Sequence, residues 1–187
     1  MNQQFRSSLT IILCTLFLSG CVGGHRNHQS RQDDSFEIPN APAALHAQPG
    51  QVLTLVAKGT GVQIYTCAIS KIDSSKYEWV FKAPEADLQN AHGKSIGKHY
   101  GGPTWEANDG SKVVGQVKAS SNESDPKSIP SLLLNAVSNS GSGVFAKTTS
   151  IQRLFPVSGK APVDGCDQEH LGKEARVSYT AQYYFYD

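Results

Sequence analysis

Residues 176–186 constrain the fold more than any other segment, because their side chains alternate strictly along the chain. One face of this segment carries the small or apolar and aromatic residues Val177, Tyr179, Ala181, Tyr183 and Phe185. A period of two residues is typical of a β-strand with one face in a core. A long aromatic strand at a sheet edge would invite aggregation. We therefore expect this strand to be paired on both sides.

Other alternating segments extend the same interpretation over most of the chain. They predict strands over residues 51–57, 62–69, 77–82, 112–118 and 144–154, with a turn at 59–61. Residues 84–110 predict mainly loops with a short strand near 95–100, and 131–137 fits either a short helix or a buried strand. About seven to eight short strands separated by turns predict an all-β single domain with long loops, either a sandwich or a closed barrel.

The N-terminus has the pattern of an export signal. Residues 1–20 combine Arg6 with a short apolar stretch, too short for the ~20 residues that span a bilayer. Leu18-Ser19-Gly20-Cys21 resembles the cleavage and lipidation site of bacterial lipoproteins, although an ordinary secretory signal is the alternative. We expect a signal peptide over 1–20, a lipidated flexible tether over 21–43 and a β-domain over 44–187. In a Gram-negative host, Val22 would favour outer-membrane sorting, with the domain facing the periplasm or the cell surface.

The cysteines suit an oxidising compartment. Cys14 leaves with the signal and Cys21 is assigned to lipid, so Cys67 and Cys166 remain in the domain. Two thiols outside the cytoplasm are most simply one disulfide, while a redox pair or two metal ligands are the alternatives.

Charge and motifs exclude several function classes. Removal of residues 1–20 takes away one basic residue, which leaves Lys+Arg balanced against the 16 Asp+Glu. A nucleic-acid partner is not expected, since phosphate binding requires clustered Lys and Arg. The chain lacks a dinucleotide fingerprint, a P-loop, a nucleophile elbow and paired-cysteine zinc spacing, so we expect no cofactor.

One segment, 99–111, concentrates residue types that carry chemistry. His99, Glu106 and Asp109 would form a metal or acid–base site if the chain folded back at the glycines between them. Tyr100 and Trp105 would offer a stacking surface for a ligand. In the alternative interpretation the segment is a structured loop, with Trp105 in the core and Asp109-Gly110 in a hairpin turn.

Several motifs together resemble a known family. They are Gly61-Val-Gln-Ile-Tyr-Thr-Cys67, His99-Tyr-Gly-Gly-Pro-Thr-Trp-Glu106, Ile129-Pro130, Ile151-Gln-Arg153, Gly165-Cys166 and Tyr179-Thr-Ala-Gln-Tyr183. They look like an uncharacterised family of secreted bacterial and fungal proteins, domain of unknown function thirty-four fifty-five, over about 43–186. The chain departs from the family pattern at Ser131 and Lys160. The resemblance implies that both cysteines belong to the domain, and it implies no activity.

Three functions remain open on these patterns. The first is a non-enzymatic envelope lipoprotein that binds a ligand or protein partner, with a carbohydrate or cell-wall component as a candidate. Its contacts would be Tyr100, Trp105, His99, Glu106, Asp109 and the tyrosines expected to be exposed on the last strand. The second is a metal-dependent enzyme that uses His99 with Glu106 or Asp109. The third is a structural envelope component. In each case Cys21 would tie the protein to a membrane.

Overall fold

The computed structural model describes residues 36–122 and 125–187. The predicted signal peptide, the predicted lipidation site at Cys21 and most of the predicted tether lie outside these residues. Within them, no helix combines the length and the apolar character needed to cross a bilayer.

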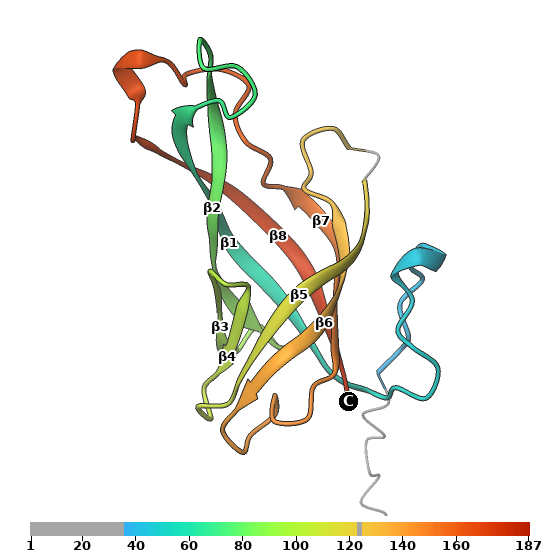
Figure 1. The fold of residues 1–187 in the computed structure, drawn as a ribbon. Helices are drawn as coiled ribbons and strands as arrows, with labels where there is room; N and C mark the ends of the chain where they lie inside the picture. Colours follow the sequence, from blue (N-terminus) through green and yellow to red (C-terminus); the bar gives the residue numbers. More distant parts are fainter. Residues whose placement is uncertain (1–35, 123–124) are drawn as a thin grey trace, which may run out of the picture. The chain divides into compact units, whose positions relative to one another are not determined.

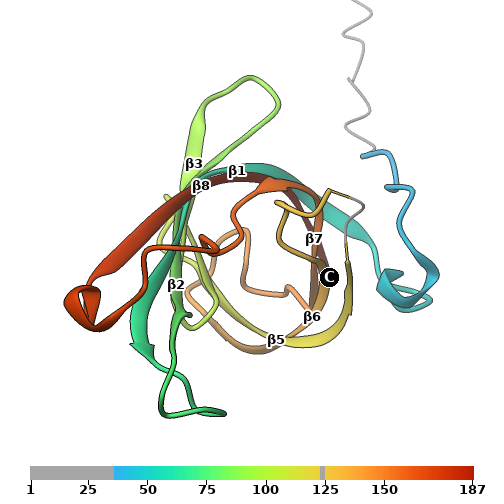
Figure 2. The ribbon, with the colours of Figure 1, turned by 90° about the horizontal axis from the view of Figure 1, so that it is seen from above.

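Eight antiparallel strands form one sheet that closes into a ring (Figures 1 and 2). In chain order they are β1 (Leu53–Ile69), β2 (Tyr77–Gln89), β3 (Ser95–Tyr100), β4 (Thr104–Ala107), β5 (Lys112–Ser121), β6 (Ser131–Ser140), β7 (Ser150–Ser158) and β8 (Glu174–Tyr186). Two short 3-10 helices, η1 (Ala43–Leu45) and η2 (Gln168–His170), complete the described elements. The predicted all-β class is confirmed, and the closed form replaces the sandwich alternative.

Each strand neighbours the next one in the chain, and β8 closes the ring by pairing with β1. The closing pair is long, running from Leu53 opposite Tyr186 to Thr66 opposite Glu174. Backbone hydrogen bonds between Val52 and Asp187 continue it beyond the strand ends. Because β8 also pairs with β7, the expectation that the last strand has two neighbours is confirmed.

The predicted turn at 59–61 is wrong, because β1 runs unbroken through it. The two glycines serve close packing instead. A Cβ on Gly59 would lie 2.5 Å from the Tyr183 ring, and one on Gly61 would lie 2.1 Å from the Glu85 carbonyl oxygen. Glycine within a strand often marks such an approach by a neighbouring backbone or ring.

Three other local predictions are decided by the structure. Residues 131–137 are strand rather than helix, within β6. The prediction of loops over 84–110 is wrong in part, since β2 extends to Gln89 and β4 occupies Thr104–Ala107, while the short strand at 95–100 is confirmed as β3. The strand predicted from residue 144 begins only at Ser150, because the main chain turns at 143–148.

The wall of the ring is uneven in height. The strands β3 and β4 have 6 and 4 residues, against 17 in β1. They pair with β2 only over Glu85–Gln89 and with β5 only over Lys112–Val114. Figure 1 shows this hairpin filling only the lower part of the wall between β2 and β5. Above it, among the described residues, the facing edges of β2 and β5 have no strand partner.

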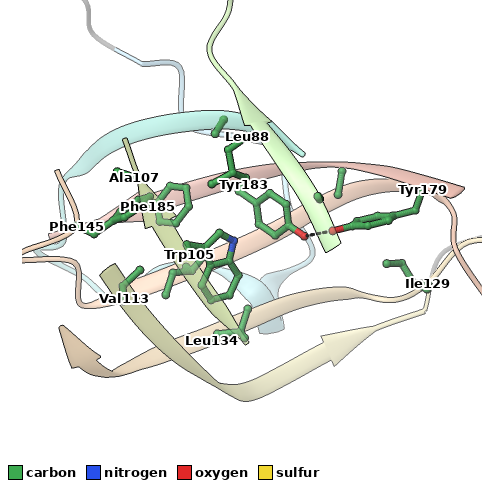
Figure 3. Close-up of a cluster of buried hydrophobic side chains, with 14 residues drawn as sticks. Leu88, Trp105, Ala107, Val113, Ile129, Leu134, Phe145, Tyr179, Tyr183 and Phe185 are labelled. Atoms are coloured by element: carbon green, nitrogen blue, oxygen red, sulfur yellow. Dashed lines mark hydrogen bonds between the residues drawn. The ribbon is translucent and has the colours of Figure 1, made fainter. Parts of the chain in front are cut away.

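Two hydrophobic clusters stabilise the ring. The larger lies inside it and includes Trp105, Phe145, Tyr183 and Phe185 (Figure 3). The smaller lies outside, where Ala41 and Leu45 pack on Leu133 and Leu154. Residues 36–187 thus contain both clusters and the ring closure, as expected of an independent folding unit.

A disulfide joins Cys67 of β1 to Cys166 in the connection before β8. The same region is held by backbone hydrogen bonds from Cys67 to Lys173 and from Gly172 to Cys67. The predicted pairing of Cys67 with Cys166 in one disulfide is therefore present in the structure.

Replacing Gly61 with Ala is expected to destabilise the domain by about 1–3 kcal/mol, because the new methyl group would meet backbone atoms of β2. Chemical denaturation of residues 36–187 measures the change in unfolding free energy. Thr60→Ala, at the exposed neighbouring position in β1, is the matched control and should change stability by less than ~0.5 kcal/mol. Equal effects at the two positions would contradict the close-approach explanation.

Denatured but unreduced protein comprising residues 36–187 should titrate no free thiol. Reduction, or the double replacement Cys67→Ala/Cys166→Ala, should cost roughly 2–5 kcal/mol of stability, because the bridge closes a loop spanning 99 positions. One or two reactive thiols in the unreduced sample would contradict the pairing.

Candidate functional site

The interior of the ring contains a cavity of about 310 Å³ above the hydrophobic core. Each of the eight strands contributes to its wall, together with the β3–β4 turn and the segment just before β6. The lining side chains are mostly apolar or aromatic: Tyr65, Phe81, Pro84, Pro103, Trp105, Val117, Ile129, Pro130, Leu132, Leu134 and Tyr183. A few polar groups, Gln63, Lys82, His99 and Arg153, stand among them. We refer to this space as the ring cavity.

Trp105 and Tyr183 lie between the core and the ring cavity. Figure 3 places Phe145 and Phe185 to one side of them and Ile129 and Tyr179 to the other. The two rings meet edge to face, with their centroids 5.7 Å apart. Because both side chains are fully buried, they separate the packed lower part of the ring from the cavity above.

His99 belongs to the same layer as Trp105. The two rings are stacked with centroids 4.4 Å apart, and the imidazole Nδ1 donates a hydrogen bond to the Thr104 carbonyl oxygen at 2.9 Å. Burial, together with the positive charge of Arg153, lowers the pKa of His99 to about 3, although the bond to Thr104 acts in the opposite direction. The imidazole is therefore neutral at pH 7.

Two buried donors beside the ring cavity lack a hydrogen-bond partner among the described residues. They are the indole Nε1 of Trp105 and the amide Nε2 of Gln63, on side chains that are 1% and 2% exposed. The Gln63 amide lies near enough to Tyr179 to lower the pKa of that phenol, but it forms no hydrogen bond of ordinary geometry with it. Burial is the larger influence and raises the pKa of Tyr179.

The predicted polar constellation does not converge. In the antiparallel pair β3–β4, His99 lies opposite Trp105 and Lys98 lies opposite Glu106, so the two pairs occupy opposite faces of the sheet. His99 therefore faces the interior, while Glu106 forms ion pairs outside with Lys98 and Lys112. Within residues 36–122 and 125–187, no group of three or more His, Cys, Asp or Glu side chains is arranged to hold a metal ion.

Tyr100 and Asp109 are engaged elsewhere. The Tyr100 hydroxyl donates to Glu106 at 2.8 Å, and this bond is the main reason that the pKa of Glu106 is lowered. Asp109 accepts hydrogen bonds from the Ser111 hydroxyl and the Val144 amide, in the hairpin turn predicted at Asp109-Gly110. Both residues therefore lie away from the ring cavity.

The expectation of exposed tyrosines on the last strand is wrong. Tyr186 is buried and donates to Gln152 at 2.7 Å, while Tyr184 is half-buried against the outer cluster. The physical reason is the segment around Leu45, which packs over this face and whose carbonyl oxygen accepts a hydrogen bond from Gln152.

Sequence patterns did not single out Gln63 or Arg153 as site residues. Each is a polar residue at an inward-facing position of its strand, and Arg153 has the same parity in β7 as the buried Ile151. This parity is the sequence signal that could have indicated an inward-facing Arg153. In the structure Ile151 lies opposite Phe185 and Arg153 lies opposite Tyr183, both on the inward face of β8.

Fold and site together define a class: a single-domain all-β protein whose antiparallel sheet closes round an internal cavity. The disulfide indicates a location outside the cytoplasm. The family described as "Protein of unknown function (DUF3455)" matches residues 48–187, and the chain belongs to this family. No curated protein matches the chain.

The free energy of unfolding should fall as the pH drops from about 6.5 towards 5. In this range His99 binds a proton in the unfolded chain but stays neutral in the folded one, where its pKa is about 3. A buried base with a lowered pKa stabilises the fold fully above its unfolded pKa, and that contribution is lost on acidification. The expected loss is about 2 kcal/mol between pH 6.5 and 5. Urea unfolding of residues 36–187 at a series of pH values measures it.

His99→Gln should flatten this pH dependence, whatever its effect on absolute stability. The exposed His92, replaced in the same way, is the control and should leave the slope unchanged. An unaltered slope in His99→Gln would show that another group is responsible.

Proposed function

We propose that this protein is an exported, non-enzymatic binding domain that holds one small, mainly apolar molecule inside the ring. The observation that carries the proposal is the ring cavity, with a volume of about 310 Å³ and walls drawn from all eight strands. Ligand pockets range from ~300 to 1,000 Å³ and are lined mainly by apolar side chains with a few polar groups. Eight-stranded antiparallel barrels are just wide enough to hold a small ligand.

The low part of the wall supplies the entrance in this proposal. Phe81 and Pro84 of β2, the β3–β4 turn and Val117 of β5 all line the ring cavity where β2 and β5 lack a strand between them. Phe81 and Val117 are 52% and 53% exposed. An apolar molecule passing between these two side chains would contact apolar surface before it entered the ring cavity.

The walls favour an apolar ligand over a carbohydrate. A sugar presents many hydroxyl groups, and each one buried without a partner is costly. The ring cavity has too few polar groups to form hydrogen bonds with all the hydroxyl groups of a sugar. Of the two aromatic residues expected to stack on a ligand, Trp105 is 1% exposed and offers no open face to solvent, and Tyr100 does not line the ring cavity.

The place of action in this proposal is the cell envelope. The signal-like residues 1–20 and the site at Cys21 support lipid attachment, and two or more acyl chains on that cysteine would hold the protein at a membrane. In a Gram-negative host that membrane would be the outer one. Because Ala41 already packs in the outer cluster, the connection between the anchor and the domain would be residues 21–40, which would leave the ring free to exchange its ligand with the surroundings.

Binding of N-phenyl-1-naphthylamine, a neutral apolar fluorophore, tests the proposal with residues 36–187. We expect saturable binding of one molecule per domain. Leu132→Trp, which fills the cavity, should weaken binding at least tenfold. Val137→Trp, on the same strand at a position 56% exposed, is the matched control and should bind as the parent does.

Unfolding midpoints of both variants would be recorded alongside, so that a loss of fold is recognised. Binding that does not saturate, or equal affinity in the parent and a folded Leu132→Trp, would contradict the proposal.

A further inference from the structure

Arg153 is the charge that the ring cavity leaves uncompensated. Two cations line the cavity, Lys82 and Arg153, and no carboxylate does. Lys82 forms an ion pair with Glu174, with 2.5 Å between Nζ and Oε1. Within the described part of the chain, no acidic side chain pairs with the Arg153 guanidinium. A partly buried charge without a counter-charge is costly, so its presence calls for an explanation.

The local contacts orient this guanidinium but do not neutralise it. Its Nε and Nη2 donate to the Pro130 carbonyl oxygen at 3.2 and 2.9 Å. Three phenols, Tyr65, Tyr179 and Tyr183, have their pKa raised by burial, and the nearby charge of Arg153 opposes this rise. All three phenols are therefore neutral at pH 7, as His99 is, so the groups around Arg153 carry no negative charge.

The two unpartnered polar atoms, like the positive charge of Arg153, favour a ligand group that accepts hydrogen bonds. Trp105 Nε1 can only donate a hydrogen bond, and Gln63 Nε2 is likewise a donor. Both lie on nine-tenths-buried side chains that line the ring cavity with Arg153. Donors together with a cation select a ligand group that accepts hydrogen bonds and carries negative charge.

We propose that the ring cavity recognises a monocarboxylate with a single apolar chain, and that Arg153 binds the carboxylate. This inference rests on the proposed ligand-binding function and specifies its ligand class. The planar guanidinium presents a fork of donors that matches the two oxygens of a carboxylate. The apolar and aromatic walls take the chain. A volume of about 310 Å³, near the lower limit for ligand pockets, suits one chain rather than a two-chain lipid.

The test compares decanoate with 1-decanol, which has the same chain length and no charge. Each displaces N-phenyl-1-naphthylamine from residues 36–187 at pH 8 and below its aggregation limit. We expect decanoate to bind at least tenfold more tightly than decanol. In Arg153→Met the ratio of the two affinities should fall to about one. Arg153→Gln, which retains an amide donor for the Pro130 carbonyl, should also lose most of the ratio and serves if the methionine variant does not fold.

Arg176→Met is the control for loss of a positive charge, because Arg176 lies outside the ring cavity and pairs with Glu85. Its ratio should match that of the parent. Equal binding of decanoate and decanol by the parent, or a ratio preserved in folded Arg153 variants, would overturn the carboxylate assignment while leaving the ligand-binding function intact. Failure of the parent to bind the fluorophore and both decyl compounds would overturn the function itself.

Discussion

The pairing of β1 with β8 is the constraint on which the rest of the molecule depends. All other strand pairs join elements that follow each other in the chain, whereas this pair joins the two ends of the sheet. Without it the sheet would have two long edges, and the inward aromatic side chains of β8 would face water. With it, Tyr183 and Phe185 meet Trp105 and Phe145 across the interior. The cavity above this layer exists because the same closure holds the opposing walls apart.

Much of the fold could be predicted from the sequence, since half-buried strands alternate with a period that is visible in the residues themselves. The strand at 176–186 follows from that period, and its two neighbours follow from the cost of leaving a long aromatic strand at an edge. The expected count of about seven to eight strands agrees with the eight present, but the expectation divides β1 in two and misses β4. Glycines limit the method. Gly59 and Gly61 suggest a turn when only their chain neighbours are considered. In the structure they allow the Tyr183 ring and the backbone of β2 to approach β1 closely. These contacts come from residues distant in sequence, so the residues next to each glycine do not indicate them.

The site could be predicted less well, for a related reason. His99, Glu106 and Asp109 are close in the chain, and this closeness predicts that their side chains converge. Antiparallel register separates them, because neighbouring residues on a strand face opposite sides of a sheet. His99 and Trp105 point inward as a stacked pair and Glu106 points out. Arg153 and Gln63 come to the same interior from β7 and β1, and nothing in the chain near either residue links it to the other.

The low hairpin β3–β4 has a consequence for how the ring can change shape. Above it, the wall has two edges that face each other without shared backbone hydrogen bonds. Separation of the upper parts of β2 and β5 would therefore break no backbone hydrogen bond between these two strands, whereas the hydrophobic core holds the lower part of the ring together. These two unpaired edges lie on one side of the ring, between β2 and β5. If the ring cavity binds a ligand as proposed, an opening at these edges would admit ligands of different width, and the polar groups of the cavity rather than the width of the opening would select among them.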